Sequence, residues 1–295
     1  MKLETIALPI VRLALAEDLG AGDVTTASLI SPSARGRAHL EARAAGVLAG
    51  IDLARLVFHE LDREIDFHAV AKDGARLKPG QTVATLAGQA RAILSGERVA
   101  LNLLQHLSGV ASATARFVDA LKGTATVVRD TRKTLPGLRV LEKYAVLVGG
   151  GRNHRFGLFD MVLIKDNHLP AAGSITGAVR AARRAHADLP IQVEVRNAEE
   201  AAEAVRAGAD QLLLDNMDPD RVRATLEHIG IEPGAPPAER GRPGRPWIEV
   251  SGGVTLANVR SFALPGVDSV AVGAITHSAP ALDLALTVES IEDYA

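Results

Sequence analysis

The stretch VRDTRKTLPGLRVLEKYAVLVGGGRNHRFGLFDMVLIKDNH, Val128 to His168, sets the pattern for the second half of the chain. It runs from the end of one short apolar strand, 126–128, to another, 161–164, with Gly149, Gly150 and Gly151 between them. Glycines let a loop adopt positive φ and bring backbone N–H groups close to a ligand. We therefore expect a ligand-binding connection between two strands.

The same stretch is cationic. It carries eight basic and four acidic residues, a local charge of +4, in a chain whose formal net charge is −2. The basic residues are Arg129, Arg132, Lys133, Arg139, Lys143, Arg152, Arg155 and Lys165. Fixed arginines bind carboxylates and phosphates through two parallel hydrogen bonds, so the expected ligand is a small polyanion.

Composition limits the class of protein. A chain of 295 residues that is 47% hydrophobic can bury a large core, and we expect one large domain and a smaller one. The net charge gives no overall basic field, which argues against nucleic acid or an anionic membrane as the partner. There are no cysteines, which excludes disulfides, thiolate metal sites and cysteine nucleophiles.

The N-terminal segment, residues 1–20, is apolar but interrupted by Arg12, Glu17 and Asp18, and it has no cleavage-site pattern. We interpret it as an amphipathic helix and not as a signal peptide. No apolar run is long and pure enough to span a bilayer. The expected location is therefore the cytoplasm.

The first half of the chain predicts a compact α+β domain. Helical periodicity covers residues 5–18, and a longer helical pattern runs from Ser95 to Leu121 with a possible bend at Ser108-Gly109. Between these helices, the pattern predicts strands at 37–47, 65–72 and 82–87 in an antiparallel sheet, and a helix at 52–61.

The second half alternates apolar strands with helices. Strands are predicted at 126–130, 161–165, 191–195, 211–215, 247–251 and 268–272, and the later helices at 175–186, 198–207, 219–229 and 256–263. Such alternation implies parallel strands joined by right-handed crossovers. Six units without a dinucleotide-binding fingerprint favour a (β/α) barrel over an open sheet.

These patterns predict three regions. An N-terminal domain with its linking helix spans 1–113, the barrel spans 114–277, and a last helix at 278–295 packs back on the N-terminal domain. A Pro/Gly/Arg-rich segment at 232–246 interrupts one helix-to-strand connection. We interpret it as a surface loop with solvent-exposed arginines, because it leaves the barrel at the end opposite the chemistry.

Polar residues end the predicted barrel strands. Asp130, Lys165, Glu194, Asp215 and Ser251 each lie within one residue of a strand's carboxyl end, where barrel enzymes place their active sites. One such charge is explicable as a core residue, but four charges and a serine at one end are not, because buried unpaired charges are costly.

Two glycine-containing loops follow the last two strands: Ser251-Gly252-Gly253, and Gly273 to His277. Barrels often bind a phosphate at this place through backbone N–H groups and helix N-termini. Arginines, a phosphate loop and two carboxylates suit a reaction between an acidic substrate and a pyrophosphate-bearing one. The carboxylates can hold Mg²⁺ or stabilise an oxocarbenium-like transition state.

The motifs together resemble the quinolinate phosphoribosyltransferase family. The block from Thr131 to His168 carries most of the resemblance. ERVALNLLQHLSGVAS precedes it, VEV, LLLDNM, EVSGGV and VGAITHSA follow it, and EDLGAGDVTT lies near the N-terminus. The motifs occur in order along nearly the whole chain.

The resemblance implies an open α/β sandwich joined to an incomplete (β/α) barrel, and a dimer or an assembly of dimers. It implies conversion of quinolinate and 5-phosphoribosyl 1-pyrophosphate, with Mg²⁺, to nicotinate mononucleotide, pyrophosphate and CO₂, on the route to NAD.

It also implies roles for particular residues. Quinolinate would lie among Thr131, Arg132, Lys133, His154 and Arg155, with Arg98 from the neighbouring subunit. The phosphoribosyl group and its metal would face Lys165, Glu194 and Asp215, with Glu194 and Asp215 holding the metal. The 5-phosphate would lie against Ser251, Gly252, Gly253, Val272, Gly273 and Ala274, with His277 nearby. Lys133, Lys165, Glu194 and Asp215 are the expected catalytic residues.

Three alternatives stay open from the sequence. Lys165 also occupies the place of a Schiff-base lysine in an aldolase, which needs a depressed pKa. A related pyrophosphorylase-like protein linked to molybdenum transport is the second. A phosphometabolite sensor without catalysis is the third, although strand-end carboxylates would repel an anionic ligand unless a metal lay between them.

Overall fold

The structure is a computed structural model that describes residues 3–232 and 245–293. The chain divides into two compact units. Unit 1 contains residues 1–115, 134–150 and 274–295, and unit 2 contains residues 116–133 and 151–273. This division differs from the predicted one, because residues 114–115, 134–150 and 274–277 group with unit 1 and not with the barrel.

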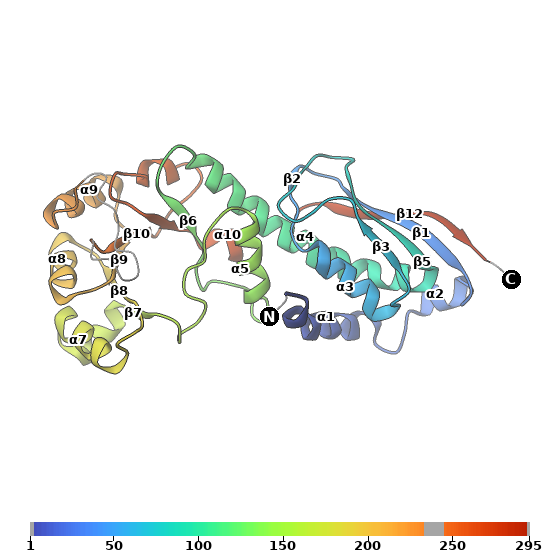
Figure 1. The fold of residues 1–295 in the computed structure, drawn as a ribbon, viewed down its shortest axis with the longest axis horizontal. Helices are drawn as coiled ribbons and strands as arrows, with labels where there is room; N and C mark the ends of the chain where they lie inside the picture. Colours follow the sequence, from blue (N-terminus) through green and yellow to red (C-terminus); the bar gives the residue numbers. More distant parts are fainter. Residues whose placement is uncertain (1–2, 233–244, 294–295) are drawn as a thin grey trace. The chain divides into compact units, whose positions relative to one another are not determined.

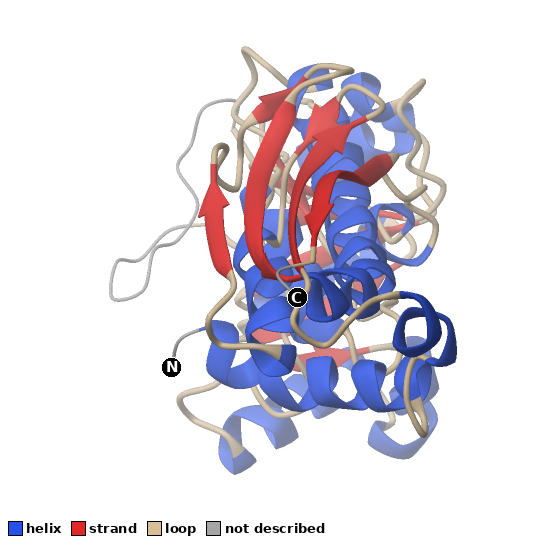
Figure 2. Ribbon diagram, turned by 90° about the vertical axis from the view of Figure 1, so that its right-hand side faces the viewer, coloured by secondary structure: helices blue, strands red, loops and turns tan. Residues whose placement is uncertain are grey.

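Unit 1 is built on an antiparallel sheet with the strand order β12-β1-β5-β3. Its strands are β1 (Arg35–Ala42), β3 (Asp66–Ala69), β5 (Thr82–Gln89) and β12 (Leu284–Glu292). Figure 2 shows these strands as adjacent red arrows. A separate pair, β2 (Gly46–Val47) and β4 (Arg76–Leu77), forms a small second sheet.

Helices α1 (Leu3–Leu19), α3 (Ile51–Leu61) and α4 (Ala90–Ala120) pack against this sheet and contribute to its core. Unit 1 also contains α2 (Val24–Leu29), α5 (Arg139–Val148) and α10 (Ala274–His277), and residues 116–120 of α4 fall in unit 2. Helix α1 buries Ala7, Val11 and Leu15, which confirms the amphipathic helix predicted there. No helix within residues 3–232 and 245–293 is long and apolar enough to cross a membrane.

Helix α4 is one continuous helix, so the predicted bend at Gly109 marks a close approach instead. A Cβ on Gly109 would lie 2.2 Å from the carbonyl oxygen of Pro280. Helix α5, which the sequence analysis missed, also packs against α4. A Cβ on Gly149 would lie 2.5 Å from the carbonyl oxygen of Ala111, and buried Glu142 accepts a hydrogen bond of 2.8 Å from His106. These contacts explain why 134–150 groups with unit 1.

The C-terminal segment is a strand and not the predicted helix. Strand β12 pairs antiparallel with β1, from Ala42 with Leu284 to Arg35 with Glu292. Its apolar residues recur every second position, at 282, 284, 286 and 288, which is the period of a strand. Pairing also satisfies the backbone groups along that edge of β1, and this tertiary gain outweighs the local helical tendency. The segment packs on the N-terminal domain as expected, but as part of its sheet.

Unit 2 contains a six-stranded parallel sheet in the order β6-β11-β10-β9-β8-β7. The strands are β6 (Val127–Arg129), β7 (Val162–Ile164), β8 (Ile191–Val195), β9 (Gln211–Asp215), β10 (Trp247–Ser251) and β11 (Ser269–Ala271). This is the order of a barrel that is open between β6 and β7. The predicted incomplete barrel is confirmed, and its six strands lie where they were expected.

Helices lie outside this sheet, as Figure 1 shows for α7, α8 and α9 beside β7 to β10. They are α7 (Ile175–Ala185), α8 (Ala198–Ala207) and α9 (Pro219–His228), preceded by η1 (Asp166–His168) and α6 (Leu169–Ala172). The helix predicted at 256–263 is only a 3₁₀ turn, η2 (Val259–Phe262). Side chains cap the N-termini of α7, α8 and α9, which explains their accurate prediction.

Most of the Pro/Gly/Arg-rich segment, 233–244, lies outside the described residues. Arg245 at its end is described, and it corrects one expectation. Its guanidinium makes two hydrogen bonds, of 2.7 and 2.8 Å, to the Asp268 carboxylate, and its side chain is only 11% exposed. This arginine is part of a buried ion pair that secures the start of β10, and it is not solvent-exposed.

Candidate active site

Four of the predicted site residues meet at the carboxyl edge of the parallel sheet. Lys165 follows β7, Glu194 lies in β8, and Asp215 and Ser251 end β9 and β10. The register pairs Ile164 with Val193 and Asp215 with Ser251, so these strand ends are neighbours. The sheet itself therefore gathers side chains that lie far apart in the sequence.

Lys165 and Glu194 form an ion pair between Lys165 Nζ and Glu194 Oε2. The lysine side chain is 42% exposed, whereas the glutamate is 12% exposed. The Lys165 backbone N–H donates a 2.8 Å hydrogen bond to Nδ1 of His168, which fixes the start of the loop. The pair presents a positive and a negative group side by side at the edge of the site.

Asp215 is joined to the first glycine loop by Asn216. The Asn216 side-chain amide donates a 2.7 Å hydrogen bond to Asp215 Oδ2, and its backbone N–H donates to the Ser251 carbonyl at 2.9 Å. Asn216 has φ 52°, the only positive φ outside glycine in the described part of the chain. Gly252 also has a positive φ, 91°, and a Cβ there would lie 2.2 Å from Asn216 Oδ1. The carboxylate and the glycine loop are thus one tightly packed assembly.

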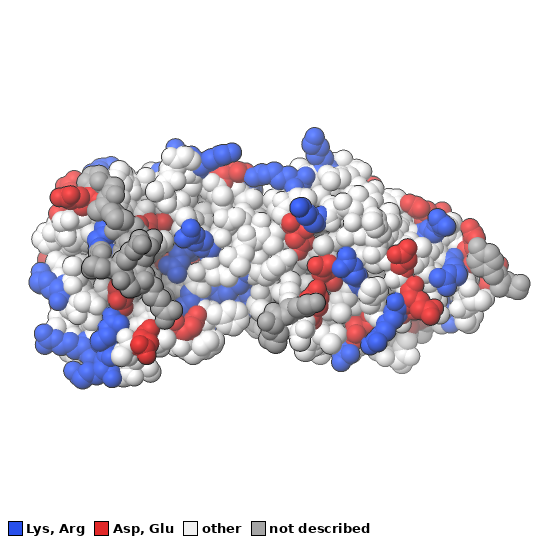
Figure 3. All heavy atoms as spheres, in the orientation of Figure 1, with Lys and Arg blue, Asp and Glu red and all other residues white. Residues whose placement is uncertain are grey.

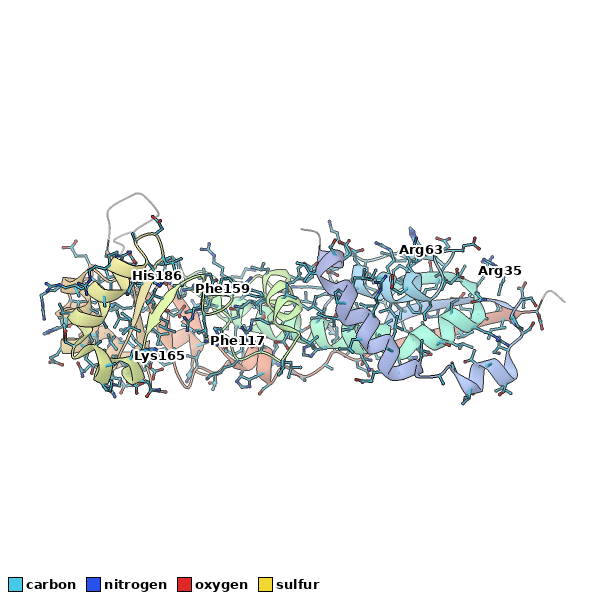
Figure 4. The ribbon with its side chains drawn as sticks, turned by 90° about the horizontal axis from the view of Figure 1, so that it is seen from below. Arg35, Arg63, Phe117, Phe159, Lys165 and His186 are labelled. Carbon is cyan, nitrogen blue, oxygen red and sulfur yellow. The ribbon has the colours of Figure 1, made fainter. Side chains whose placement is uncertain are left out.

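A cationic pocket lies along the edge strand β7 and the last turns of α7. Of the four strand-end residues named above, Lys165 lines this pocket, and Glu194, Asp215 and Ser251 do not. The pocket has a volume of about 620 Å³ and is lined by Arg132, Arg155, Leu158, Met161, Val162, Leu163, Lys165, Asn167, His168, Ala181, Ala182, Ala185 and His186. Figure 4 labels Lys165 and His186 near helix α7. Figure 3 shows that charged side chains of both signs are spread over one face of the molecule. The pocket differs from that surface because three basic side chains, Arg132, Arg155 and Lys165, line it together.

Arg155 is held within this pocket wall. Its Nη1 donates a 3.1 Å hydrogen bond to the Met161 carbonyl. Burial lowers the pKa of Arg155, the nearby charge of Arg132 lowers it further, and Asp160 acts in the opposite direction. The charge of Arg132 disfavours that of Arg155, and an anion bound beside Arg155 would favour it.

The loop after Arg155 is organised by Asp160. Its carboxylate accepts backbone hydrogen bonds of 2.6 Å from Phe156 and 3.0 Å from Gly157. Burial raises the pKa of Asp160, but these backbone donors, followed by the charge of Arg155, lower it below its usual value overall. The carboxylate therefore stays ionised and keeps the loop fixed beside the pocket.

His154 is buried, with 8% exposure, and both of its ring nitrogens have protein partners. Nδ1 accepts a 2.7 Å hydrogen bond from the Arg155 backbone N–H, and Nε2 lies 2.9 Å from Gln192 Oε1. It does not line the cationic pocket described above. In this arrangement His154 supports Arg155, and its expected contact with a substrate carboxylate stays a prediction.

The eight basic residues of the central stretch do not form one site. Arg129 pairs with buried Glu249 at 2.9 Å, and Asp130 accepts a 2.8 Å hydrogen bond from the His154 backbone N–H. Arg139 and Lys143 lie on α5, in unit 1, and Lys143 is only 2% exposed. The sequence therefore predicted too many cations in one cluster. The net charge of a segment does not show which of its basic side chains are buried or form ion pairs elsewhere in the fold.

The other predicted site residues are divided between unit 1 and unit 2. Thr131 accepts a 3.0 Å hydrogen bond from the backbone N–H of exposed Lys133, next to Arg132 in unit 2. Arg98, Ala274 and His277 belong to unit 1, where the Arg98 side chain is 59% exposed. Gly253 and Val272 follow β10 and β11, and Gly273 ends unit 2.

Three further residues were missed by the sequence analysis: Asn216, Gln192 and Glu249. Asn216 carried a signal, because asparagine directly after a strand end tolerates a left-handed backbone. Gln192 and Glu249 also carried one, since each is a polar residue inside an apolar strand and both are fully buried. Polar side chains in such positions require partners, and these two have them.

The fold and the site define an incomplete (β/α) barrel protein with a cationic pocket beside the carboxyl end of β7. Comparison with known proteins then specifies the family. The N-terminal and C-terminal domain models of quinolinate phosphoribosyl transferase match residues 23–108 and 110–287. The chain belongs to this family.

Its relatives match over most of their length. A nicotinate-nucleotide pyrophosphorylase (carboxylating) from Mycobacterium leprae is 43% identical over 279 residues, which are 94% of this chain and 95% of the relative. The human protein of the same name is 41% identical and covers 88% of this chain and 84% of the relative. The solved structure of the nicotinate-nucleotide pyrophosphorylase from Francisella tularensis matches with a TM-score of 0.87 at 36% identity, and the match covers 98% of each chain.

Proposed function

We propose that this enzyme transfers the phosphoribosyl group of 5-phosphoribosyl 1-pyrophosphate to quinolinate and releases pyrophosphate and CO₂, which gives nicotinate mononucleotide for NAD biosynthesis. The main structural support for this proposal is the pocket of about 620 Å³ that is lined by Arg132, Arg155 and Lys165. Its basic side chains suit a small ring with two carboxylates. The relatives, which carry this activity in their names, support the same reaction.

Arg132 and Arg155 are the proposed carboxylate-binding residues. Guanidinium groups bind carboxylates through charge-assisted hydrogen bonds, which are about twice as strong as neutral ones. The partial burial of Arg155 strengthens such contacts by removing competing water. Thr131, Lys133 and His154 lie within two residues of these arginines and complete the proposed quinolinate subsite.

Glu194 and Asp215 are the proposed residues for the donor and its Mg²⁺. No group of three or more metal-binding side chains occurs among the described residues, so a fully protein-bound metal site is absent from that part of the chain. Two carboxylates suit Mg²⁺ nevertheless, because Mg²⁺ usually keeps water and phosphate oxygens as its other ligands. When bound, it would neutralise charge on pyrophosphate.

Bond changes in the reaction balance as two steps. The lone pair of the pyridine nitrogen forms a bond to ribose C1, and the bond from C1 to the pyrophosphate oxygen breaks with its electrons. The ring nitrogen is then cationic and draws electrons from the adjacent carbon. The bond from that carbon to its carboxylate breaks, CO₂ leaves, and the carbon takes a proton from solvent.

The protein's contribution to these steps is positional and electrostatic. The arginines orient the ring so that its nitrogen faces C1, and Lys165 offers a positive charge to the phosphoribosyl group. The loops at 251–253 and 272–274 are the proposed binding site of the 5-phosphate, and His277 is proposed to assist there. The Val272 backbone N–H already donates to the Arg129 carbonyl at 2.9 Å, so other backbone groups of these loops would bind the phosphate. No covalent catalyst is needed.

The alternatives have less support. A Schiff-base lysine must be uncharged to attack a carbonyl, whereas Lys165 is paired with the Glu194 carboxylate. A sensor that only binds an anion would be weakened by carboxylates at its site, because they repel an anionic ligand. The family models and the names of the relatives support the quinolinate reaction and not a molybdenum-linked role.

We further propose that the active enzyme is a cytoplasmic homodimer, or an assembly of dimers, in which Arg98 completes the quinolinate subsite of the neighbouring subunit. The exposed side chain of Arg98 supports this role, because within the described residues its ion pair is a 3.8 Å contact with the adjacent Glu97. Such an exposed ion pair contributes little, so the arginine is available for a stronger partner.

The deciding experiment is an assay of the purified protein with quinolinate, 5-phosphoribosyl 1-pyrophosphate and Mg²⁺, which follows CO₂ and nicotinate mononucleotide together. We expect both products in equal amounts and none with nicotinate in place of quinolinate. Activity should disappear with excess chelator and return with Mg²⁺. Product from nicotinate without CO₂ release, or a borohydride-trapped adduct at Lys165, would refute the proposal.

A further inference from the structure

Glu249 is a fully buried carboxylate in the middle of β10, inside the barrel. Four side chains from other elements contact it. Arg129 Nη1 lies 2.9 Å and Ser269 Oγ 3.0 Å from its Oε2, while His154 Nε2 lies 3.1 Å and Gln192 Nε2 3.4 Å from its Oε1. A buried carboxylate needs such partners, because its desolvation is otherwise prohibitive. The proposed reaction assigns no role to this residue.

An ionised carboxylate can only accept hydrogen bonds, and this property orders the groups around it. The amide of Gln192 must turn its NH₂ toward Glu249, so its Oε1 faces His154 at 2.9 Å. His154 must then carry its proton on Nε2. Its Nδ1 is left as an acceptor, and the Arg155 backbone N–H donates to it at 2.7 Å.

A chain of hydrogen bonds with a defined donor and acceptor at each step therefore connects Glu249, through Gln192 and His154, to the backbone of Arg155. A second buried carboxylate, Asp130, fixes the same segment by accepting from the His154 backbone N–H at 2.8 Å. The backbone N–H groups of two successive residues are thus both held by groups inside the barrel. The backbone of Arg155 is fixed in this way, and its side chain lines the cationic pocket.

We propose that Glu249 is a positioning residue, which acts through Gln192 and His154 to fix the tautomer of His154 and the placement of Arg155 for binding a substrate carboxylate. This inference rests on the proposed function, because the substrate is the proposed quinolinate. Glu249 itself does not touch the substrate. A glutamine in its place could donate or accept, and the order of hydrogen bonds would no longer be unique.

The direct test is the variant Glu249→Gln, which keeps the size of the side chain. We expect the KM for quinolinate to rise about tenfold or more, since a misplacement of about 1 Å in a binding group can cost about a hundredfold. The KM for 5-phosphoribosyl 1-pyrophosphate should stay within about twofold. A double variant, Glu249→Gln with His154→Gln, should be no worse than the more impaired single variant, because both changes break one chain of contacts.

Asp268→Asn provides the matched control. Asp268 is also a buried carboxylate that pairs with an arginine, Arg245, and it accepts a 2.7 Å hydrogen bond from the Ile248 backbone N–H. These contacts hold the start of β10 and involve neither His154 nor Gln192. This variant should lose stability without a change in the KM for quinolinate. An equal rise in KM in both variants, or no rise in folded Glu249→Gln, would overturn the inference.

A second measurement uses the unaltered protein and does not depend on the folding of a variant. Nitrogen NMR of ¹⁵N-labelled histidine distinguishes the two neutral tautomers, and the signal of His154 is identified by its loss in His154→Gln. We expect neutral imidazole with the proton on Nε2. A proton on Nδ1 would overturn the inference even if the enzyme uses quinolinate. Absence of quinolinate turnover in the unaltered protein would instead refute the proposed function. The NMR measurement would still show which nitrogen of His154 carries the proton.

Discussion

At the scale of single residues, the proposed function predicts that Arg132 and Arg155 set the affinity for quinolinate. Alanine at either position deletes a charge-assisted hydrogen-bond partner worth roughly 1.5–3 kcal/mol. We expect the KM for quinolinate to rise about ten- to a hundredfold and the KM for the phosphoribosyl donor to change much less. Steady-state kinetics with each substrate varied in turn measures both constants.

Arg223→Ala is the control for these arginine variants. Arg223 lies on α9 and forms an exposed ion pair with Asp220, and such pairs contribute little. Its removal should leave both constants unchanged. If Arg132→Ala and Arg155→Ala weakened both substrates equally, the arginines would not be carboxylate-specific.

Gly252 tests the coupling of Asp215 to the first glycine loop. Alanine at Gly252 would place a Cβ 2.2 Å from Asn216 Oδ1, and φ 91° is itself unfavourable for alanine. We expect a higher KM for the phosphoribosyl donor and for Mg²⁺, together with a lower Tm. Gly208→Ala separates the two effects, because Gly208 has φ 85° with nothing within 4 Å of its Cβ position. It should lower the Tm and leave both KM values unchanged.

Glu249 gives a pH dependence of stability with a definite sign. Burial raises its pKa, but Arg129, His154 and Ser269 lower it more strongly, to about 2 from an ordinary 4.5. A depressed pKa contributes stability above pH 4.5 that is lost as the pH falls toward 2. We expect the gap in unfolding free energy between the unaltered protein and Glu249→Gln to narrow across this range. Urea denaturation at a series of pH values measures it, and a gap that is constant or widens toward low pH would contradict the expectation.

At the scale of elements, β12 is held in the sheet of unit 1 by its buried first residue. Leu284 is 2% exposed and its carbonyl accepts a 2.6 Å hydrogen bond from Gln105 on α4. Leu284→Ala should lower the unfolding free energy by about 2–5 kcal/mol, which is the range for leucine deletions in cores. Ile291→Ala, in the same strand but 40% exposed, should cost less than about 1 kcal/mol. Equal losses in thermal or urea unfolding would contradict the burial pattern.

At the scale of the whole molecule, the proposed dimer predicts complementation between inactive chains. Arg98→Ala removes the group offered to the neighbouring site, and Lys165→Ala inactivates a chain's own site. In a mixed dimer one site receives an intact Arg98 and retains Lys165, so we expect a fraction of the activity to return after subunit exchange. Exchange is verified with differently tagged chains. No recovery after verified exchange would mean that each site is built from one chain.

The order and type of most elements followed from the sequence alone. The six barrel strands are mainly apolar runs of three to five residues, and later helices begin at capping residues such as Ser174 and Asn197. Local chemistry of this kind is readable because it depends on neighbours in the chain. The strand-end residues Lys165, Glu194 and Asp215 followed from the same pattern, since parallel strands present their carboxyl ends at one edge.

Only the tertiary structure decided which charges remain available at the site and where the chain's last segment lies. Arg129 is used by Glu249 and Lys143 is buried in unit 1, and both facts depend on contacts between residues far apart in the sequence. Residues 284–292 form a strand because β1 offers an edge with unpaired backbone groups. The sequence determined the local elements and the residue types of the site, because these are set by propensity and period. Pairing, burial and the direction of each hydrogen bond were decided by the folded structure, because they depend on which groups meet in space.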